Sequence, residues 1–342
     1  MGCQVGEASA STIRHMVETY KARLSAAARH GQGLTWEGAL LQASKYYPYA
    51  VEHTPRHIDE LRGMAEGAEV AFDDLMVLNC WEEITDDAIY QRCTSVAVSA
   101  ELAADGHVLV GHNEDWLPED EENVYLVNAT PDDEPPFLAV TYGGLLPNIG
   151  FNAQGIAQCC DSVYPDDVRG GVPRIFVSRA VLGAARLGEA IRSTLLPARA
   201  AGYNHLIADR SGELYNVEVS ARRFAILYGI KGYLAHTNNY HSRRMKQLED
   251  ETEDLVSSHL RVNRATRLLH NARPHNLETL KAILSDHANH PDSICRHLNP
   301  EDESPDQGKT IVALIMDLTD LEMHACWGNP CTTAFHTYHL ES

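Results

Sequence analysis

Residues 92–99 read Arg92-Cys93-Thr94-Ser95-Val96-Ala97-Val98-Ser99 and mark a change in the character of the chain. β-branched side chains follow Cys93 closely, a composition that predicts a β-strand with the cysteine at its head. Upstream, residues 1 to 90 carry the apolar spacing of helices, and strand patterns are scarce there. Downstream, short alternating segments take over. We therefore expect the chain to change at Cys93 from a helical segment to a region built largely of strands.

A second predicted strand follows a short turn. Residues 107–116 begin with an apolar run and end polar, and residues 104–106 (Ala-Asp-Gly) supply the turn. Antiparallel pairing would bring the far end of this strand beside the start of the first, so Asn113 and Asp115 should lie close to Cys93. Their spacing of two residues puts both on one face of the strand.

The remaining segments order as strands, then helices, then strands. Further strands are predicted at residues 123–128, 137–142, 155–160, 203–209, 213–219, 223–228, 310–318 and 322–327. Helices are predicted at residues 9–29, 36–46, 55–65, 72–81, 173–186, 187–196, 260–270 and 277–287. This order favours an α+β fold over alternating βαβ units. Apolar and aromatic residues within 140–151 could line a neutral pocket.

Composition narrows the classes of partner. The 342 residues carry a formal net charge of -20, which argues against nucleic acid and anionic membrane surfaces. The longest apolar stretches, such as residues 310–316, are far shorter than the roughly 20 residues that span a bilayer. With no basic, hydrophobic signal region at its start, we expect a soluble, cytoplasmic protein. Acidic runs such as residues 119–122 are expected to be solvated.

The eight cysteines show no paired spacing, so reduced thiols are expected. Cys159 and Cys160 are adjacent rather than separated as in metal knuckles. We expect no metal and no cofactor.

Four short motifs, in order, resemble the isopenicillin N acyltransferase family of N-terminal-nucleophile hydrolases, cysteine type. They are Cys93-Thr94-Ser95, Gly111-His112-Asn113-Glu114-Asp115-Trp116, His236-Thr237-Asn238 and Ser293-Ile294-Cys295-Arg296. The similarity covers most of the chain from Cys93 onward. It implies a four-layer αββα sandwich of two antiparallel sheets, preceded by a helical N-terminal segment.

The resemblance also implies self-processing. The precursor would cut itself between Arg92 and Cys93, so that residues 1–92 become a small subunit and residues 93–342 a catalytic one, held together as a heterodimer. The new α-amine, with a reference pKa of about 7.7 to 8.0, would then serve as the base for the thiol. No Cys-His pair would be needed.

Roles for the other residues follow from the same resemblance. Asp115 would bond the new α-amine or orient its neighbours, and Asn113 could join the same cluster as a substrate-binding residue. Asn238 matches an oxyanion donor. Arg296 matches an arginine near the nucleophile that could orient Asp115 or favour the thiolate.

Two positions depart from the family pattern. Arg92 stands where the family usually has glycine before the nucleophile. Asp161 stands where relatives have an asparagine lining the acyl site, and a carboxylate there would disfavour anionic acyl groups. This points to a neutral or cationic substrate.

Three functions remain open from the sequence. The leading one is hydrolysis or acyl transfer on a small N-acyl amide through a thioester on Cys93, with an acyl donor and an amine acceptor in the transfer case. A metal-dependent hydrolase is suggested by residues 287–290 (His-Ala-Asn-His) and the acidic clusters, although the His-Glu-x-x-His pattern is missing. The third is a non-catalytic acidic binding protein that keeps the fold but has lost self-processing. The reason to consider it is Arg92, which replaces the glycine usual in the family. The acyl and amine groups of the substrate stay undetermined.

Overall fold

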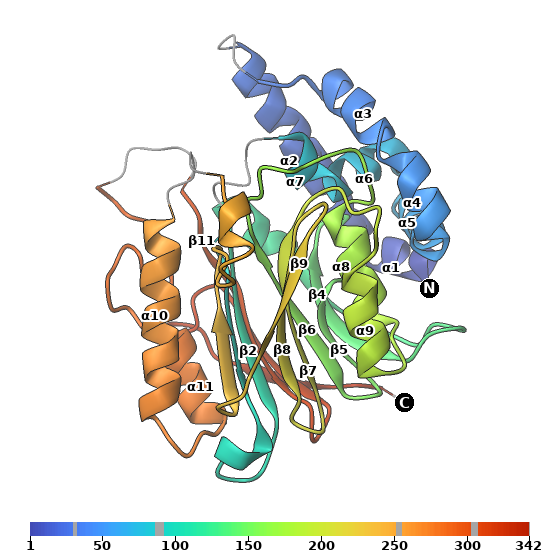
Figure 1. Cartoon of the computed structure of the whole chain (residues 1–342). Helices are drawn as coiled ribbons and strands as arrows, with labels where there is room; N and C mark the ends of the chain where they lie inside the picture. Colours follow the sequence, from blue (N-terminus) through green and yellow to red (C-terminus); the bar gives the residue numbers. More distant parts are fainter. Residues whose placement is uncertain (30–32, 86–91, 251–254, 302–306, 342) are drawn as a thin grey trace.

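Two antiparallel sheets stacked face to face form the centre of the molecule (Figure 1). The structure, a computed structural model, describes residues 1–29, 33–85, 92–250, 255–301 and 307–341. One sheet has the strand order β10-β1-β2-β11-β12-β13, and the other runs β3-β4-β5-β6-β7-β8-β9. The first comprises β1 (Thr94–Val98), β2 (Leu109–Trp116), β10 (Tyr233–His236), β11 (Lys309–Asp317), β12 (Glu322–Trp327) and β13 (His336–His339). The second comprises β3 (Val124–Ala129), β4 (Phe137–Tyr142), β5 (Ile149–Asn152), β6 (Ile156–Ser162), β7 (Tyr203–Asp209), β8 (Leu214–Val219) and β9 (Phe224–Tyr228).

Helices cover both outer faces of this pair of sheets (Figure 1). The first sheet is covered by α10 (Val256–Asn271) and α11 (Leu277–Leu284), whose apolar residues pack on β1, β2 and β11. The second is covered by α8 (Arg174–Leu182) and α9 (Leu187–Thr194). Short 3-10 turns lie at η2 (Ala100–Leu102), η3 (Pro118–Asn123) and η4 (Lys246–Leu248). The expected four-layer αββα sandwich is confirmed.

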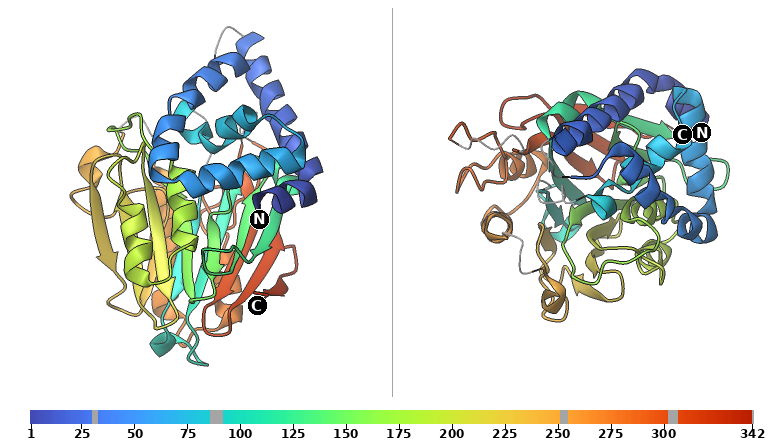
Figure 2. Two further views of the ribbon diagram at one scale, coloured as in Figure 1. Left: turned by 90° about the vertical axis from the view of Figure 1, so that its right-hand side faces the viewer. Right: turned by 90° about the horizontal axis from the view of Figure 1, so that it is seen from above.

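The N-terminal helices pack across one end of the sandwich (Figure 2). They are α1 (Gly2–Ala8), α2 (Ala10–Arg29), α3 (Trp36–Ser44), α4 (Tyr47–His53), α5 (Pro55–Ala68), α6 (Phe72–Asn79) and α7 (Trp81–Ile84). Met16 and Tyr20 of α2 share one buried apolar cluster with Trp116 and Tyr142 of the two sheets. Gly143 permits this approach, because its φ of 53° suits glycine and a Cβ there would lie 1.6 Å from the Met16 sulfur. Residues before and after Cys93 therefore share a core.

Each strand predicted from the sequence is present, with its ends displaced by at most two residues. The prediction misses β5, β10 and β13, whose four residues each are too few to establish an alternation. It also misses the short helices α1, α4 and α7. The helix expected at residues 173–186 ends at Leu182, and the one expected at 277–287 ends at Leu284.

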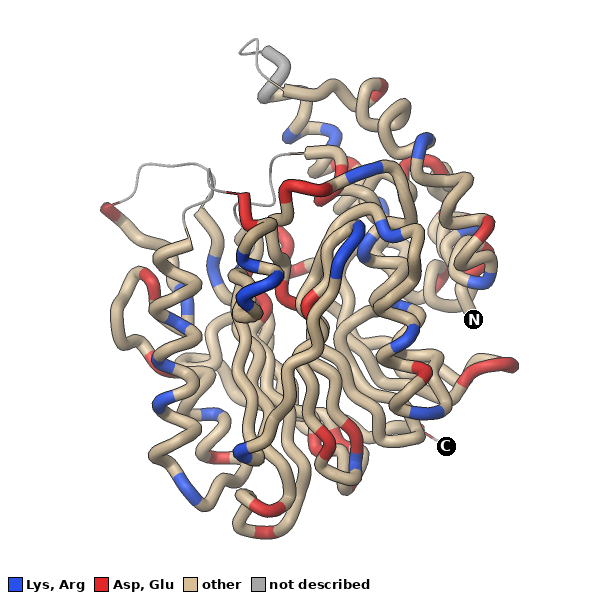
Figure 3. The backbone as a smooth tube through the Cα atoms, viewed as in Figure 1, with Lys and Arg blue, Asp and Glu red and all other residues tan. Residues whose placement is uncertain are grey.

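Charged positions fall largely on the helices and on the loops at the ends of the strands (Figure 3). Asp120 is an exception to the expected solvation of its acidic run. It is buried, it accepts a 2.8 Å hydrogen bond from the Tyr20 hydroxyl, and burial raises its pKa to about 7. Within the described residues, no helix combines the length and apolarity needed to cross a bilayer.

Candidate active site

Cys93 is the last residue before β1, and its backbone is held from two directions. The side chain is buried, with the whole residue 2% exposed. Its N–H donates to Asn238 Oδ1 at 2.9 Å, and its carbonyl accepts from Arg261 Nη1. Arg261, from α10, also donates to Thr94 Oγ1 at 2.9 Å and to Asn238 Oδ1 at 2.7 Å. One buried guanidinium thus fixes both Cys93 and the residue that accepts its N–H.

The Cys93 thiol faces a carboxylate. Its Sγ lies 3.5 Å from Glu114 Oε2. Burial raises the pKa of Cys93 well above its usual value, and the charges of Glu114, Asp161 and Asp115 raise it further. The thiol is therefore protonated in the intact chain, and any attack by it needs a base.

Strand register explains why Glu114 is the residue at the thiol. Thr94 pairs with Asn113 across β1 and β2. Cys93 and Glu114 are the next opposed residues of the two strands, so their side chains turn to the other face, between the sheets. Glu114 Oε2 lies 2.9 Å from His112 Nε2, and His112 Nδ1 lies 2.9 Å from Ser95 Oγ. The thiol is therefore one end of a buried polar chain.

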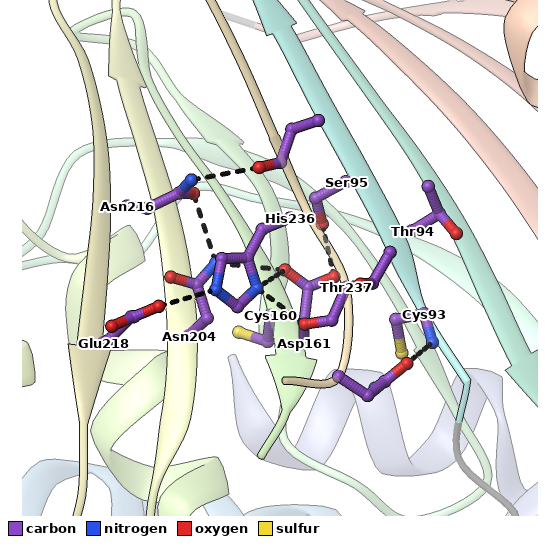
Figure 4. A network of polar contacts seen from close by, with 12 residues as sticks. Cys93, Thr94, Ser95, Cys160, Asp161, Asn204, Asn216, Glu218, His236 and Thr237 are labelled. Atoms are coloured by element: carbon purple, nitrogen blue, oxygen red, sulfur yellow. Dashed lines mark hydrogen bonds and ion pairs between the residues drawn. The ribbon is translucent and has the colours of Figure 1, made fainter. Parts of the chain in front are cut away.

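This chain continues across to the second sheet through Asp161 (Figure 4). Asp161 accepts from Ser95 Oγ at 2.8 Å, and its second oxygen accepts from Asn204 and lies 3.4 Å from His236 Nδ1. His236 also contacts Glu218 at 3.1 Å. Burial alone would lower the pKa of His236, but hydrogen bonds to Asp161 and Glu218 raise it to about 9. Asp161, expected to meet the substrate, thus shares a buried, positively charged imidazole with Glu218.

The opposite face of β2 carries the Asp115 side chain. The backbone of Asp115 lies beside the proposed cleavage site. The Arg92 N–H donates to the Asp115 backbone carbonyl at 3.2 Å. In the side chain, Oδ1 accepts from Thr310 Oγ1 at 2.6 Å, while the buried Oδ2 has no hydrogen-bond partner among the described residues. Burial raises the Asp115 pKa to about 7, against the opposing effects of Arg261, the Thr310 hydrogen bond and Arg296. A proton or a new cation could therefore be taken up at this oxygen.

Asn113 shares that outer face, as expected from its spacing, but its amide is committed elsewhere. Nδ2 donates to the carbonyls of Leu284 and Ile294, each at 2.9 Å. The structure therefore directs Asn113 to the end of α11 and the segment before Arg296, rather than to the Cys93 thiol.

The two remaining predicted residues flank Cys93 in different ways. Asn238 Nδ2 donates to the Ser162 carbonyl at 3.0 Å, so its oxygen, rather than its expected donor group, faces the Cys93 N–H. Arg296 lies near enough to Asp115 to act on its pKa, and the Arg296 N–H donates to Thr310 Oγ1 at 2.9 Å. Thr310 thereby bridges Arg296 to Asp115.

A small cavity opens beside the thiol. Its lining combines Cys93 and Glu114 with apolar, aromatic and neutral polar side chains, namely Tyr142, Leu145, Asn148, Ile149, Cys160, Ser162, Ile175 and Tyr203. Four of these fall in the segment 140–151, and three of the four are the apolar or aromatic side chains that the sequence suggested for a neutral pocket: Tyr142, Leu145 and Ile149. An adjoining hollow shares Tyr142, Leu145 and Ile175 and is closed by Trp81 and Glu82 of α7. The N-terminal helices thus help to close the space next to the thiol.

Sequence reasoning missed Glu114 and Arg261. Glu114 lies inside the motif that drew attention to Asp115, and the register of β1 and β2 was the signal that would have identified it. Arg261 is 168 residues from Cys93 in the chain, and nothing local in α10 marks it as buried.

One protein-family profile matches most of the chain. The profile, described as acyl-coenzyme A:6-aminopenicillanic acid acyl-transferase, matches residues 102–332. The beta-alanyl-dopamine/carcinine hydrolase of Drosophila melanogaster is 26% identical over 313 residues, which cover 82% of this chain and 79% of that protein. The 40 kDa form of acyl-coenzyme A:6-aminopenicillanic-acid-acyltransferase from Emericella nidulans is 24% identical over 267 residues, covering 77% and 72% respectively. A conjugated bile acid hydrolase from Clostridium perfringens is similar in structure with a TM-score of 0.49 at 14% identity, over 73% of this chain and 97% of that one. Because the profile spans more than half of the sequence, this protein belongs to the acyl-coenzyme A:6-aminopenicillanic acid acyl-transferase family.

Proposed function

We propose that this chain is a self-processing amide hydrolase or acyltransferase whose nucleophile is Cys93. The names of its relatives give a hydrolase and an acyltransferase. The proposal rests on the contacts of Cys93. Its backbone is held by Asn238 and Arg261, and its thiol faces Glu114 at 3.5 Å. A merely structural buried cysteine needs neither arrangement.

Self-cleavage would begin with the intact chain. Cys93 Sγ attacks the carbonyl carbon of Arg92, the C–N bond breaks, and the nitrogen of Cys93 takes a proton to become an α-amine. The resulting thioester on Cys93 is hydrolysed by water, which leaves a carboxylate on Arg92 and restores the thiol. No α-amine exists before this step, so the base must be another group, and Glu114 is the carboxylate in contact with the thiol.

After cleavage the α-amine would take over as base for the thiol. The unpartnered Oδ2 of Asp115 offers it a counter-charge close by. Cys93 would then attack the carbonyl carbon of an N-acyl compound, release its amine, and hold the acyl group as a thioester until water or another amine takes it. Asn238 and Arg296 would hold this geometry, and donation from Asn238 to the oxyanion would require its amide to leave Ser162.

The cavity favours a small, uncharged acyl group. Its lining is mainly aromatic, apolar and neutral polar, with Glu114 as the charged member. Asp161 contributes little to this choice because its charge is shared with His236. The substrate would be a small N-acyl amide, a description that fits the beta-alanyl-dopamine in the name of the Drosophila relative.

The two fragments, residues 1–92 and 93–342, would remain together as a heterodimer after the cut. Ile13, Met16 and Tyr20 are buried in the same cluster as Trp116 and Tyr142. Separating the fragments would expose this apolar surface to water, which is unfavourable.

The test is intact-protein mass spectrometry of the wild type, Cys93→Ala and the control Cys326→Ala, which removes another buried cysteine. We expect the wild type and the control to yield two fragments divided at the Arg92-Cys93 bond, and Cys93→Ala to stay whole. A panel of small N-acyl amides then identifies the substrate. A wild type that stays whole and turns over none of the panel would favour the non-catalytic binding protein.

A further inference from the structure

A second cluster of cysteine and histidine side chains lies away from the Cys93 thiol. It comprises His287, Cys295, His297 and Cys331, and one potential ligand atom of each lies within 4.8 Å of all the others. The two sulfurs are 3.6 Å apart, and the Nε2 atoms of His287 and His297 are 3.1 Å apart. His297 Nε2 lies 3.6 Å from the Cys295 sulfur and 3.3 Å from that of Cys331.

These separations are close to the edges of a metal tetrahedron. Zinc bonds of about 2.3 Å to sulfur and about 2.0–2.1 Å to nitrogen would separate two sulfurs by about 3.8 Å, two nitrogens by about 3.4 Å and a sulfur from a nitrogen by about 3.6 Å. The four measured edges fall within a few tenths of an ångström of these values. Two thiols and two imidazoles are also the donor set of closed, structural zinc sites.

The surrounding backbone fixes both halves of the cluster. The Cys295 N–H donates to the Asp286 carbonyl at 3.0 Å, and the Asp286 carboxylate in turn holds Arg264 through two hydrogen bonds. On the other half, Asn329 Nδ2 donates to the Arg296 carbonyl at 2.7 Å and contacts the Cys295 sulfur at 3.5 Å. An N–H directed at a ligand sulfur is the kind of outer contact that orients metal ligands.

We propose that His287, Cys295, His297 and Cys331 bind one structural Zn²⁺ ion. On binding, the two thiols lose their protons to solvent and the two neutral imidazoles donate through Nε2, so the complex is electrically neutral. The four ligands follow no familiar metal-binding spacing, because three of them lie within residues 287–297 and the fourth follows in a separate loop. His290, which drew attention together with His287, is not among the four.

The position of the site suggests what the ion does. Arg296 lies between the two ligands Cys295 and His297, and it is tied through Thr310 to Asp115. An ion that joins residues 287–297 to the loop at Cys331 would hold Arg296 beside β11. Its role would be to position this segment, and the ion would stand outside the chemistry at Cys93.

The test measures metal directly in the full-length protein, purified without a metal-affinity tag. Wild type, Cys331→Ser, His297→Gln and the control Cys326→Ser are analysed for zinc, stripped with a chelator and titrated with Co²⁺. We expect one equivalent of zinc in the wild type and control, and Co²⁺ absorption bands of a tetrahedral site with thiolate ligands. Each ligand variant should bind Co²⁺ more weakly by more than about 100-fold, the upper effect of losing only an outer-shell contact.

Three results would overturn the proposal. The stripped wild type could fail to bind Zn²⁺ or Co²⁺, or both ligand variants could bind as tightly as the control. Peptide mapping of the wild type could also show Cys295 and Cys331 joined by a disulfide, with the loss of two hydrogens, instead of binding a metal. Circular dichroism of each variant shows whether it is folded, and the two ligand variants in different parts of the chain keep the test decisive if one is not.

Discussion

At Cys93 a thiol is buried between two sheets among carboxylates, whereas at Cys331 a thiol lies at the surface among imidazoles and a second thiol. At Cys93 the neighbours are a possible base, Glu114, and a guanidinium that holds the backbone, Arg261. At Cys331 the neighbours are donors that converge on one point.

The groups around a cysteine decide whether it is suited to be a nucleophile or a metal ligand. A nucleophile needs a single group to take its proton and space for an electrophile, and the cavity beside Cys93 supplies both. A metal ligand needs several donors at fixed separations, which two loops supply around Cys331. Burial alone would not distinguish the two, since Cys295 of the metal cluster is also buried.

The largest expected effect comes from removing one of the two cysteines at a time and comparing the two variants. Cys93→Ala should lower turnover of an N-acyl amide by about 10⁴-fold or more, as for removal of other covalent nucleophiles, and should keep its zinc. Cys331→Ser should lose its zinc and still be cut between Arg92 and Cys93. Turnover, zinc content and intact mass are measured on the same preparations. A Cys93→Ala protein without zinc would show that the two centres are not independent.

Replacing the neighbour of the nucleophile comes next. Glu114→Gln keeps the size of the side chain but removes its ability to take the thiol proton, so self-cleavage should slow by about 10²- to 10⁴-fold. Turnover per cleaved molecule should fall less, because the α-amine then serves as base. The control is Glu122→Gln, which changes an exposed residue of the nearby acidic run. Equal losses in cleavage and in turnover would rule out a special role for Glu114 before the cut.

The part of the candidate active site that is local in sequence could be predicted. β-branched residues after Cys93 gave the strand, and the turn at residues 104–106 gave its antiparallel neighbour and hence the nearness of Asp115. The face could not be predicted, because side chains alternate and only the register of Thr94 with Asn113 shows that Glu114 turns toward the thiol. Asn113 was placed near Cys93 from its spacing alone; its Nδ2 donates to the Leu284 and Ile294 carbonyls, and its role in substrate binding stays a prediction.

Contacts between distant segments lay outside what local patterns can give. Arg261 reaches Cys93 only because α10 packs on β1 and β10. The same holds for the metal cluster, where residues 287–297 meet Cys331 through tertiary structure. β10 carries His236 of the recognised motif, yet its four residues were too short to stand out as a strand.

Asp115→Asn should have a smaller effect, which is seen in how the free energy of unfolding depends on pH. The Asp115 pKa of about 7 in the folded chain exceeds the ordinary 3.8, so the folded state binds more protons between these values. The stability that this group contributes is fully present below pH 4 and is lost as pH rises through 7, by up to about 4 kcal/mol. Asp115→Asn should flatten that decline. Urea unfolding between pH 4 and 8 measures it, in a Cys93→Ala background that keeps the chain whole.

The matched control for Asp115 is Asp120→Asn, which removes the other buried carboxyl with a pKa of about 7. It should flatten the decline by a similar amount, because burial is the main cause at both positions. Only Asp115→Asn, made in the chain that can cleave, should also slow turnover. A stability profile that neither substitution changes would contradict the raised pKa values.

Chelation gives the smallest expected effect and separates a structural ion from a catalytic one. When the free-ion concentration is 100 times the dissociation constant, binding stabilises the folded state by about 2.7 kcal/mol. Removal of the ion should therefore lower the unfolding temperature of the wild type by several degrees. Cys331→Ser should show no such shift. At 25 °C, well below unfolding, turnover should persist in the chelator, because in the proposed mechanism Cys93 acts through Glu114 or its own amine. Immediate loss of turnover without loss of structure would instead revive the metal-dependent hydrolase, and would move the ion from the segment around Arg296 into the reaction itself.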